Sequence, residues 1–244
     1  MKKIFERPKT LRNVRTHYCP GCGHGVIHRL ICEVIDELGI RQKVIGIAPV
    51  GCAVIAYDYW DFDTTEAAHG RPPAVATGIK RMRPENIVFT YQGDGDLAAI
   101  GTAEIIHAAN RGENISVFFV NNGTYGMTGG QMAPTTIINQ WTTTSPRGRN
   151  AKIEGYPLKI SEMLAILPGV SFLERTSTHS PKEILKTKTA IKKAFLKQME
   201  NKGFSMVEIL SACPTYWKMS AKDAMKRIEK EVLPYYPLGV LAER

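Results

Sequence analysis

Acidic and amide side chains stand at a spacing that suits a metal–phosphate site. The segment Gly93-Asp94-Gly95-Asp96 follows an apolar run, and Asn121-Asn122 ends the next one, with 25 residues between Gly95 and the first asparagine. Glycine lets a backbone approach phosphate closely, while Asp94 offers an anionic oxygen and Asn122 a neutral one. Such ligands suit Mg²⁺ that bridges phosphate groups. Gly-Asp-Gly alone would also fit an ordinary turn, so the prediction depends on the spacing and the strand context.

Four of the five cysteines lie in turn-like segments and could bind a metal. Cys19-Pro20-Gly21-Cys22 places two thiolates in a tight turn where both can reach one centre. Cys52 and Cys213 each follow an apolar segment, whereas Cys32 lies within an expected helix. An odd number of cysteines without an export signal argues against a disulfide framework. The residues alone leave zinc and an iron–sulfur cluster equally open, with a thioredoxin-like redox pair as a third reading.

The elements that must position these residues alternate between apolar runs and helix-like segments. This alternation favours an α/β fold, a parallel sheet flanked by helices. Strands are expected at 44–47, 87–91, 115–120 and 206–210, and helices at 24–38, 72–82, 97–109, 161–167 and 181–200. Both oxygen-rich segments then fall at the carboxyl ends of neighbouring strands, where open α/β sheets bind ligands. Residues 123–157 are rich in Gly, Thr, Pro and Asn and are expected to form a long functional loop.

Length and composition favour one globular domain. We expect a core domain at 17–217, a leader at 1–16, and a basic helix with a tail, an appendage, at 218–244. The apolar runs are too short to cross a bilayer, so no membrane is expected and the location should be cytoplasmic. The net charge of +9 favours acidic partners, but no nucleic-acid-binding motif is apparent and solvated helix faces account for the charge.

The order of the motifs resembles a known family. Gly-Asp-Gly followed by Asn-Asn at this distance is similar to the signature of thiamine-diphosphate enzymes, which implies a thiamine-diphosphate-binding fold of the diphosphate-binding type. Over about residues 17–217 the chain resembles the β subunit of 2-oxoacid:ferredoxin oxidoreductases. The matching motifs are Cys19-Pro20-Gly21-Cys22-Gly23, Gly51-Cys52, His69-Gly70-Arg71, Gly93–Asp96, Tyr125–Gln131 and Cys213-Pro214-Thr215.

This resemblance implies cofactors and the residues that bind them. Mg²⁺ would be held by Asp94, Asn122 and the backbone carbonyl of Thr124. A four-iron four-sulfur (4Fe-4S) cluster would be held by Cys19, Cys22, Cys52 and Cys213, which leaves Cys32 as a core residue. Thiamine diphosphate would contact Val50, Gly51, Cys52 and Ala53 at its thiazolium side and Gly95, Asp96, Gly126 and Met127 at its diphosphate.

The histidines divide into one functional candidate and five others. The resemblance implies that His69 approaches the cofactor or substrate as a catalytic residue, although on its own it could cap a turn. The others are expected to be structural or to face solvent: His17, His24, His28, His107 and His179.

The family reaction is the oxidative decarboxylation of a 2-oxoacid. Coenzyme A collects the acyl group, and electrons pass through the cluster to ferredoxin. The stretch Val75–Lys80 and the loop Gly123–Thr136, which has Thr-Gly-Gly-Gln where some members have a lysine, look most like branched-chain enzymes. We therefore expect 2-oxoisovalerate or another branched-chain 2-oxoacid as substrate, with pyruvate or 2-oxoglutarate as alternatives.

Two other functions are compatible with these residues, and one part of a thiamine enzyme is not apparent in the sequence. A non-redox thiamine-dependent decarboxylase subunit with a zinc site is the first rival, and a non-enzymatic binding module with a basic face is the second. Thiamine enzymes need a glutamate that activates the aminopyrimidine, and no segment here resembles the domain that carries it. An α-type partner subunit would supply that glutamate, with γ and small ferredoxin-like δ subunits as further candidate partners.

Overall fold

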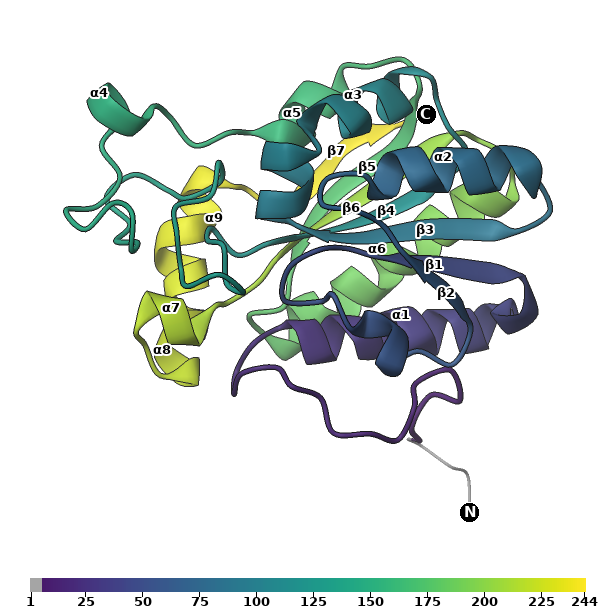
Figure 1. The fold of residues 1–244 in the computed structure, drawn as a ribbon, viewed down its shortest axis with the longest axis horizontal. Coiled ribbons are helices and arrows are strands. Elements are labelled where there is room, and N and C mark those ends of the chain that lie inside the picture. Colours follow the sequence, from purple (N-terminus) through teal and green to yellow (C-terminus); the bar gives the residue numbers. More distant parts are fainter. Residues whose placement is uncertain (1–5) are drawn as a thin grey trace.

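The computed structural model describes residues 6–244, and Figure 1 shows one sheet enclosed between two layers of helices. Within that range the sheet has seven strands in the order β2-β1-β3-β4-β6-β5-β7. The strands are β1 (Val44–Ala48), β2 (Asp63–Glu66), β3 (Ile87–Gly93), β4 (Ser116–Asn121), β5 (Val170–Ser177), β6 (Phe204–Leu210) and β7 (Gly239–Glu243). Neighbouring strands are parallel except for β5 and β7. The predicted α/β fold is confirmed.

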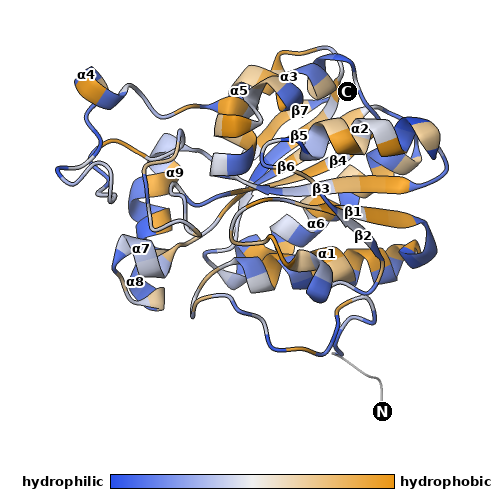
Figure 2. Cartoon of the chain, viewed as in Figure 1, coloured by the Kyte–Doolittle hydropathy of each residue, from blue (hydrophilic) through white to orange (hydrophobic). Residues whose placement is uncertain are grey.

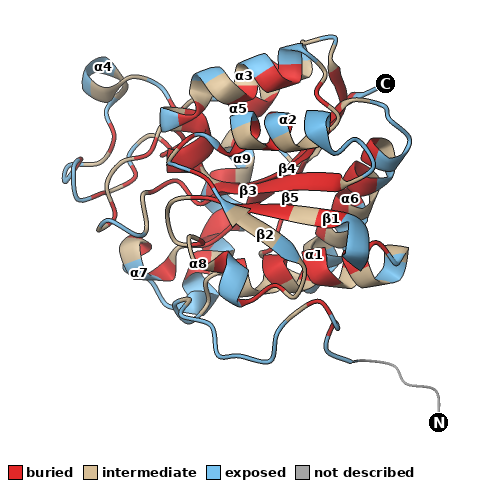
Figure 3. Ribbon diagram, turned by 45° about the vertical axis from the view of Figure 1, so that its right-hand side comes forward, coloured by how far each residue is buried: buried red, intermediate tan, exposed pale blue. Residues whose placement is uncertain are grey.

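Helices cover both faces of the sheet. The helices α1 (His24–Leu38) and α6 (Pro181–Met199) lie on one face, and α2 (Pro72–Met82), α3 (Thr102–Asn110) and α5 (Ile160–Ala165) lie on the other (Figure 1). The strands between them are mostly apolar and buried, as Figures 2 and 3 show. Continuous apolar strands are what a parallel sheet with two covered faces requires.

Local signals explain where the two longest helices begin or end. Helix α1 ends at Gly39, whose φ of 65° lies in the left-handed region that glycine adopts without strain. Helix α6 follows Ser180, whose hydroxyl accepts a hydrogen bond from the Glu183 backbone N–H, and it has Pro181 at its first position. Both helices match the ranges that the sequence predicted.

The helix predicted at 97–109 is interrupted. Residues Asp96–Ile100 form a wide π-type turn (η3), in which the Gly101 N–H donates to the Asp96 carbonyl oxygen at 2.8 Å, and α3 starts only at Thr102. Widened turns of this kind are often found at functional sites. Here the turn begins directly after the Gly-Asp-Gly segment.

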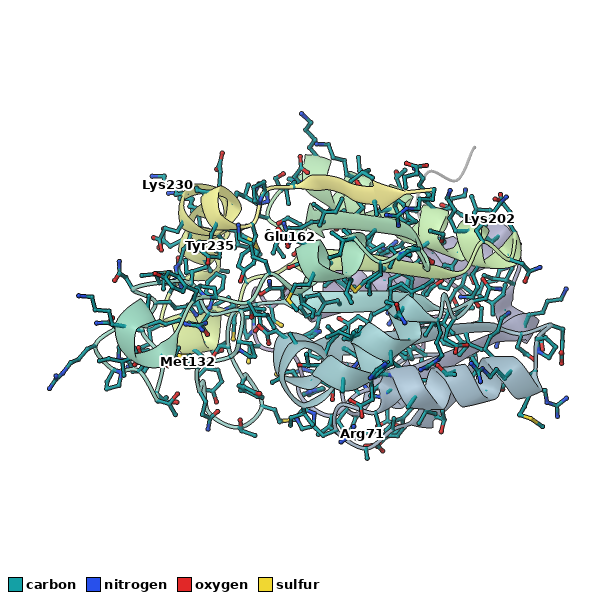
Figure 4. The ribbon with its side chains drawn as sticks, turned by 90° about the horizontal axis from the view of Figure 1, so that it is seen from above. Arg71, Met132, Glu162, Lys202, Lys230 and Tyr235 are labelled. Atoms are coloured by element: carbon teal, nitrogen blue, oxygen red, sulfur yellow. The ribbon has the colours of Figure 1, made fainter. Side chains whose placement is uncertain are left out.

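The C-terminal segment 218–244 is built into the fold, contrary to the expectation of an appendage. Strand β7 extends the sheet by pairing with β5, and Ile228 and Tyr236 are buried in a separate apolar cluster. In Figure 4, Lys230 and Tyr235 lie at one end of the molecule, and Lys202, which precedes β6, lies at the other. The part of the segment before β7 therefore lies at the carboxyl ends of the parallel strands. Its short helices are α8 (Ala221–Arg227), η4 (Ile228–Val232) and α9 (Leu233–Tyr235).

Other short elements connect the main ones. They are η1 (Arg41–Lys43), η2 (Ala56–Asp58), α4 (Ala151–Glu154) and α7 (Pro214–Trp217). Residues 1–5 of the predicted leader lie outside the described residues, whereas Thr10 is buried and its hydroxyl donates to the Cys32 carbonyl oxygen at 3.0 Å. The leader thus packs on α1, and the domain boundaries themselves stay predictions.

Part of the positive charge is paired within the molecule. Lys188 on α6 lies 2.8 Å from Glu33 and 2.7 Å from Glu37, and Lys192 lies 3.1 Å from Glu37. These lysines join α6 to α1, so they are not all available to an acidic partner. In residues 6–244 no helix has the length and apolarity that crossing a membrane requires.

Candidate active site

A pocket opens at the carboxyl ends of β1, β3 and β4. The loops after these strands and the segment before α2 form its walls. Every residue that the sequence predicted to contact thiamine diphosphate or Mg²⁺ lines this pocket. Their individual roles stay predictions.

Asp94 lies directly after β3 and is 2% exposed. The Gly95 N–H donates to its Oδ1 at 2.9 Å, and the Thr135 hydroxyl donates to its Oδ2 at 2.7 Å. Burial nevertheless raises the pKa of Asp94 to about 6, because these hydrogen bonds only partly offset the cost of burying a charge. Within residues 6–244 neither lysine nor arginine lines the pocket. The carboxylate therefore lacks the cation that a divalent metal ion would supply.

The turn after β4 offers two further oxygen atoms as candidate metal ligands, the side-chain oxygen of Asn122 and the backbone carbonyl oxygen of Thr124. Asn122 Oδ1 accepts a hydrogen bond from the Thr124 N–H at 3.2 Å, and Trp217 Nε1 donates to the Asn122 carbonyl oxygen at 3.1 Å. The backbone of Asn122 also contacts the Asp94 carboxylate. A carboxylate, an amide oxygen and a nearby carbonyl are all ligands that Mg²⁺ accepts, so the donor set fits this ion.

His69 is held by a buried carboxylate. Its Nδ1 lies 2.6 Å from Asp96 Oδ1, which also accepts the Gly70 N–H at 2.9 Å. The other oxygen of Asp96 accepts the Gln92 side-chain amide at 2.6 Å. Because a carboxylate only accepts hydrogen bonds, His69 carries its proton on Nδ1. In the uncharged form of the ring, the Nε2 atom is then an acceptor.

Two glycines allow close packing around the pocket. A Cβ atom on Gly95 would lie 2.1 Å from Tyr125 Cε1, and one on Gly126 would lie 2.8 Å from Cys52 Sγ. Either side chain would force the pocket wall apart. The glycines thus permit the loop after β4 to contact both the Gly-Asp-Gly segment and a cysteine.

Four cysteines gather at one end of the pocket and form what we call the cysteine site: Cys19, Cys22, Cys52 and Cys213. Burial raises the pKa of Cys52 to about 12, with smaller contributions from the thiols of the other three. Burial likewise raises the pKa of Cys213 to about 12, and Cys22 and Cys19 again contribute. A Cβ atom on Gly126 would lie 2.8 Å from Cys52 Sγ and 3.9 Å from Cys213 Sγ, so both sulfurs lie close to this glycine. Cys32 is buried within α1 and its thiol donates to a backbone carbonyl.

The position of His24 differs from the expectation. It was expected to be structural, but it lines the pocket, with an exposed fraction of 3%. Its backbone N–H donates to the Cys22 sulfur, its Nδ1 lies 2.6 Å from the Tyr91 hydroxyl oxygen, and burial lowers its pKa to about 4. The sequence did contain an indication that His24 lies at the site, because this residue directly follows the Cys-Pro-Gly-Cys-Gly turn. Other lining residues not singled out as contacts were Pro49, Gly93, Tyr125 and Thr128.

A buried ion pair supports the end of β4. Arg175 on β5 and Glu208 on β6 are each 1% exposed, and Arg175 Nε donates to Glu208 Oε2 at 2.7 Å. Asn121 donates its side-chain amide to Glu208 Oε1 at 2.8 Å. The pair therefore fixes the residue directly before Asn122. The sequence offered no signal for this long-range contact.

Comparisons with known proteins agree with this geometry. A family model described as the thiamine pyrophosphate enzyme, C-terminal TPP binding domain, matches residues 49–209. The 2-oxoglutarate synthase subunit KorB of Archaeoglobus fulgidus is 36% identical over 215 residues, which cover 88% of this chain and 76% of that protein. The chain belongs to the 2-oxoacid:ferredoxin oxidoreductase subunits.

Two further relatives extend the comparison within this oxidoreductase family. The ketoisovalerate oxidoreductase subunit VorA of Methanothermobacter marburgensis is 50% identical over all of this chain, which covers 51% of VorA. The chain thus spans about half the length of the VorA relatives it matches. The 2-oxoglutarate:ferredoxin oxidoreductase from Magnetococcus marinus, solved with 2-oxoglutarate, coenzyme A and succinyl-CoA bound, is 26% identical with a TM-score of 0.78, over 99% of this chain and 86% of that one. The predicted family and thiamine-binding fold are confirmed.

Proposed function

We propose that this chain is the thiamine-diphosphate-binding part of an enzyme that oxidatively decarboxylates a 2-oxoacid, forms an acyl-CoA and reduces ferredoxin. One observation carries the proposal: a single pocket is lined both by Asp94 and by Cys52 of the cysteine site. Bound thiamine diphosphate supplies an electron sink for cleavage of the bond to the carboxylate. The chain's own residues bind that cofactor, orient the substrate and hold a path for electrons.

The pocket residues divide into a metal end and a reacting end. Asp94, the Asn122 side chain and the Thr124 carbonyl would hold Mg²⁺ beside the diphosphate, with Gly95, Gly126 and Met127 around it. Val50, Gly51, Cys52 and Ala53 would border the thiazolium. The Asp96 side chain is engaged by His69 and Gln92, so we propose that only its backbone contacts the diphosphate. His69 Nε2 would then be an acceptor that faces the bound cofactor and substrate.

We propose a 4Fe-4S cluster rather than zinc at the cysteine site. Four thiolates suit either a zinc ion or an iron–sulfur cluster. The similarity of this chain to subunits of 2-oxoacid:ferredoxin oxidoreductases, enzymes named for an electron acceptor, favours the cluster over the non-redox rival.

The partners follow from what the pocket lacks. Within the described residues no glutamate lines the pocket, so we propose that an α-type subunit supplies the activating glutamate. Ferredoxin is the proposed electron acceptor, with γ and δ subunits as further partners and the cytoplasm as the location. Solvent exposure of Cys19 offers the cluster an edge near the surface.

The proposed substrate is 2-oxoisovalerate. Both VorA relatives are named for ketoisovalerate, and they match the whole of this chain at 50% and 47% identity. The KorB relatives, named for 2-oxoglutarate, match at lower identity. Pyruvate and 2-oxoglutarate remain the alternatives to be tested.

The test uses the complete enzyme, purified anaerobically with its partner subunits. We expect a brown enzyme that contains, for each copy of this chain, about four iron atoms more than its ferredoxin-like δ subunit holds, and that reduces methyl viologen with CoA and a 2-oxoacid. Among 2-oxoisovalerate, pyruvate and 2-oxoglutarate, the first should show the highest kcat/KM. A colourless enzyme that releases carbon dioxide without reducing viologen would establish the zinc-containing decarboxylase instead.

A further inference from the structure

The pocket contains two imidazoles that are tethered in different ways. His24 comes from the start of α1 and His69 from the loop before α2, and both line the same pocket. Each ring is held through Nδ1, His24 by the Tyr91 hydroxyl and His69 by the Asp96 carboxylate, in both cases at 2.6 Å. In the described residues neither Nε2 has a hydrogen-bond partner within the chain. Both Nε2 atoms are therefore available to a ligand.

The two tethers select opposite tautomers. Asp96 can only accept, so His69 presents a lone pair on Nε2. Tyr91 is fully buried, and among residues 6–244 the His24 ring is the one acceptor within reach of its hydroxyl proton. Tyr91 therefore donates to His24 Nδ1, because a buried hydroxyl that donated to nothing would be costly. His24 then carries its proton on Nε2 and presents a donor.

His24 lies at the reacting end of the pocket. Its backbone N–H donates to the Cys22 sulfur, and its ring centroid lies 5.0 Å from that of Tyr18, next to the cysteine site. The metal end is formed by Asp94 and the turn after β4. His24 and Cys52 line the same pocket, so a donor on His24 would serve the reacting end, where a substrate would meet the thiazolium.

We propose that His24 is a substrate-binding residue whose Nε2–H donates to an oxygen of the 2-oxoacid, and that Tyr91 positions it. This proposal rests on the proposed function and adds to it a donor that complements the acceptor on His69. A 2-oxoacid carries only acceptor oxygens, and the described pocket lining has no lysine or arginine to meet them. An imidazole N–H of fixed orientation meets that need.

The test measures binding separately from turnover. The complete enzyme is loaded with Mg²⁺ and thiamine diphosphate, and the Kd of an acylphosphonate analogue of the 2-oxoacid, which cannot lose carbon dioxide, is measured by calorimetry. We expect His24→Gln to weaken the analogue about tenfold, or about 1.4 kcal/mol. Tyr91→Phe removes only the tethering hydroxyl and should weaken it about threefold. Both should leave the Kd of thiamine diphosphate within twofold of the wild type.

A control variant separates binding from a structural role. His28 lies one turn further along α1, is 1% exposed, stacks on Tyr91 at a centroid distance of 4.7 Å and does not line the pocket. His28→Gln should lower the stability without changing analogue affinity. Unchanged analogue affinity in folded His24→Gln, or equal loss in His28→Gln, would overturn the proposal. If His24→Gln does not fold, unchanged affinity in Tyr91→Phe would overturn it.

The binding experiment distinguishes a failure of the proposed function from a failure of the His24 proposal. A wild-type enzyme that does not bind thiamine diphosphate would overturn that function, whereas thiamine diphosphate binding with an insensitive His24 variant would overturn only this inference. Loss of thiamine diphosphate binding in His24→Gln would place the ring against the cofactor instead of the substrate, and would also count against the proposal.

Discussion

Replacing Asp94 with asparagine is expected to stabilise the cation-free protein and to abolish its response to Mg²⁺ and thiamine diphosphate. Burial raises the pKa of Asp94 from 3.8 to about 6. A shift of about two units corresponds to about 3 kcal/mol of cost for the ionised form at neutral pH. Asparagine keeps an acceptor for the Gly95 N–H but loses the hydrogen bond from Thr135, which offsets about 1 kcal/mol. The expected net gain in unfolding free energy is about 2 kcal/mol.

The difference in unfolding free energy between Asp94→Asn and the wild type should depend on pH. Because the pKa is higher in the folded state, the cost is absent below about pH 4, where the carboxyl is protonated in both states, and is complete above about pH 6. The variant and the wild type should therefore differ by less at pH 4.5 than at pH 7.5. Urea unfolding in EDTA across this range measures the difference.

The exposed Asp58 provides the control for this experiment. Asp58→Asn should change the unfolding free energy by less than about 0.5 kcal/mol at either pH. The reasoning about a buried, unpaired carboxylate is refuted if Asp94→Asn is less stable than the wild type at pH 7.5 in EDTA. It is also refuted if Mg²⁺ with thiamine diphosphate still raises the variant's stability.

Three other changes test the support of the site. Arg175→Met should lower the unfolding free energy by about 3–5 kcal/mol, because it leaves the buried Glu208 carboxylate unpaired. The control Arg83→Met breaks an exposed pair at 3.9 Å and should lower it by less than about 1 kcal/mol. Equal losses of the two variants in urea unfolding would contradict this prediction. Gly126→Ala should lower iron content, because its Cβ would lie 2.8 Å from Cys52 Sγ, and full iron occupancy would argue against the close contact. Cys32→Ala should retain all iron by chemical analysis, since that thiol is buried within α1 away from the cysteine site; loss of iron would make it a ligand.

The positions of the metal ligands could be predicted because parallel strands end at one edge of a sheet. Asp94 and Asn122 follow β3 and β4, which pair directly in register from Phe89 with Ser116 to Gly93 with Val120. The spacing in the sequence is therefore enough to predict that Asp94 and Asn122 lie close together. The same reasoning could not bring Cys213 to Cys52, because their contact depends on how α7 and the first loop fold over the sheet.

The unpredicted strands are polar in β2, interrupted by charged residues in β5, or short and at the sheet edge in β7. Strand β2 is Asp-Thr-Thr-Glu, an edge strand that forms only because β1 offers its backbone. Strand β5 carries a fully buried Arg175, whose charge is tolerated because Glu208 stands beside it. Strand β7 is a short antiparallel edge strand. In each case the partner, and not the strand's own sequence, determines the structure.

The loop that carries Cys52 shows why the two proposed cofactors belong together. Cys52 lines the pocket, and its carbonyl oxygen lies 2.8 Å from His17 Nε2, which fixes the loop from the side of the cysteine site. Its sulfur approaches Gly126, whose neighbours follow Asn122 in the loop after β4. No separate layer of protein therefore stands between the proposed cluster ligand and the proposed thiazolium site. A change that moves this loop should alter both iron content and thiamine diphosphate affinity, since one short segment forms part of both sites.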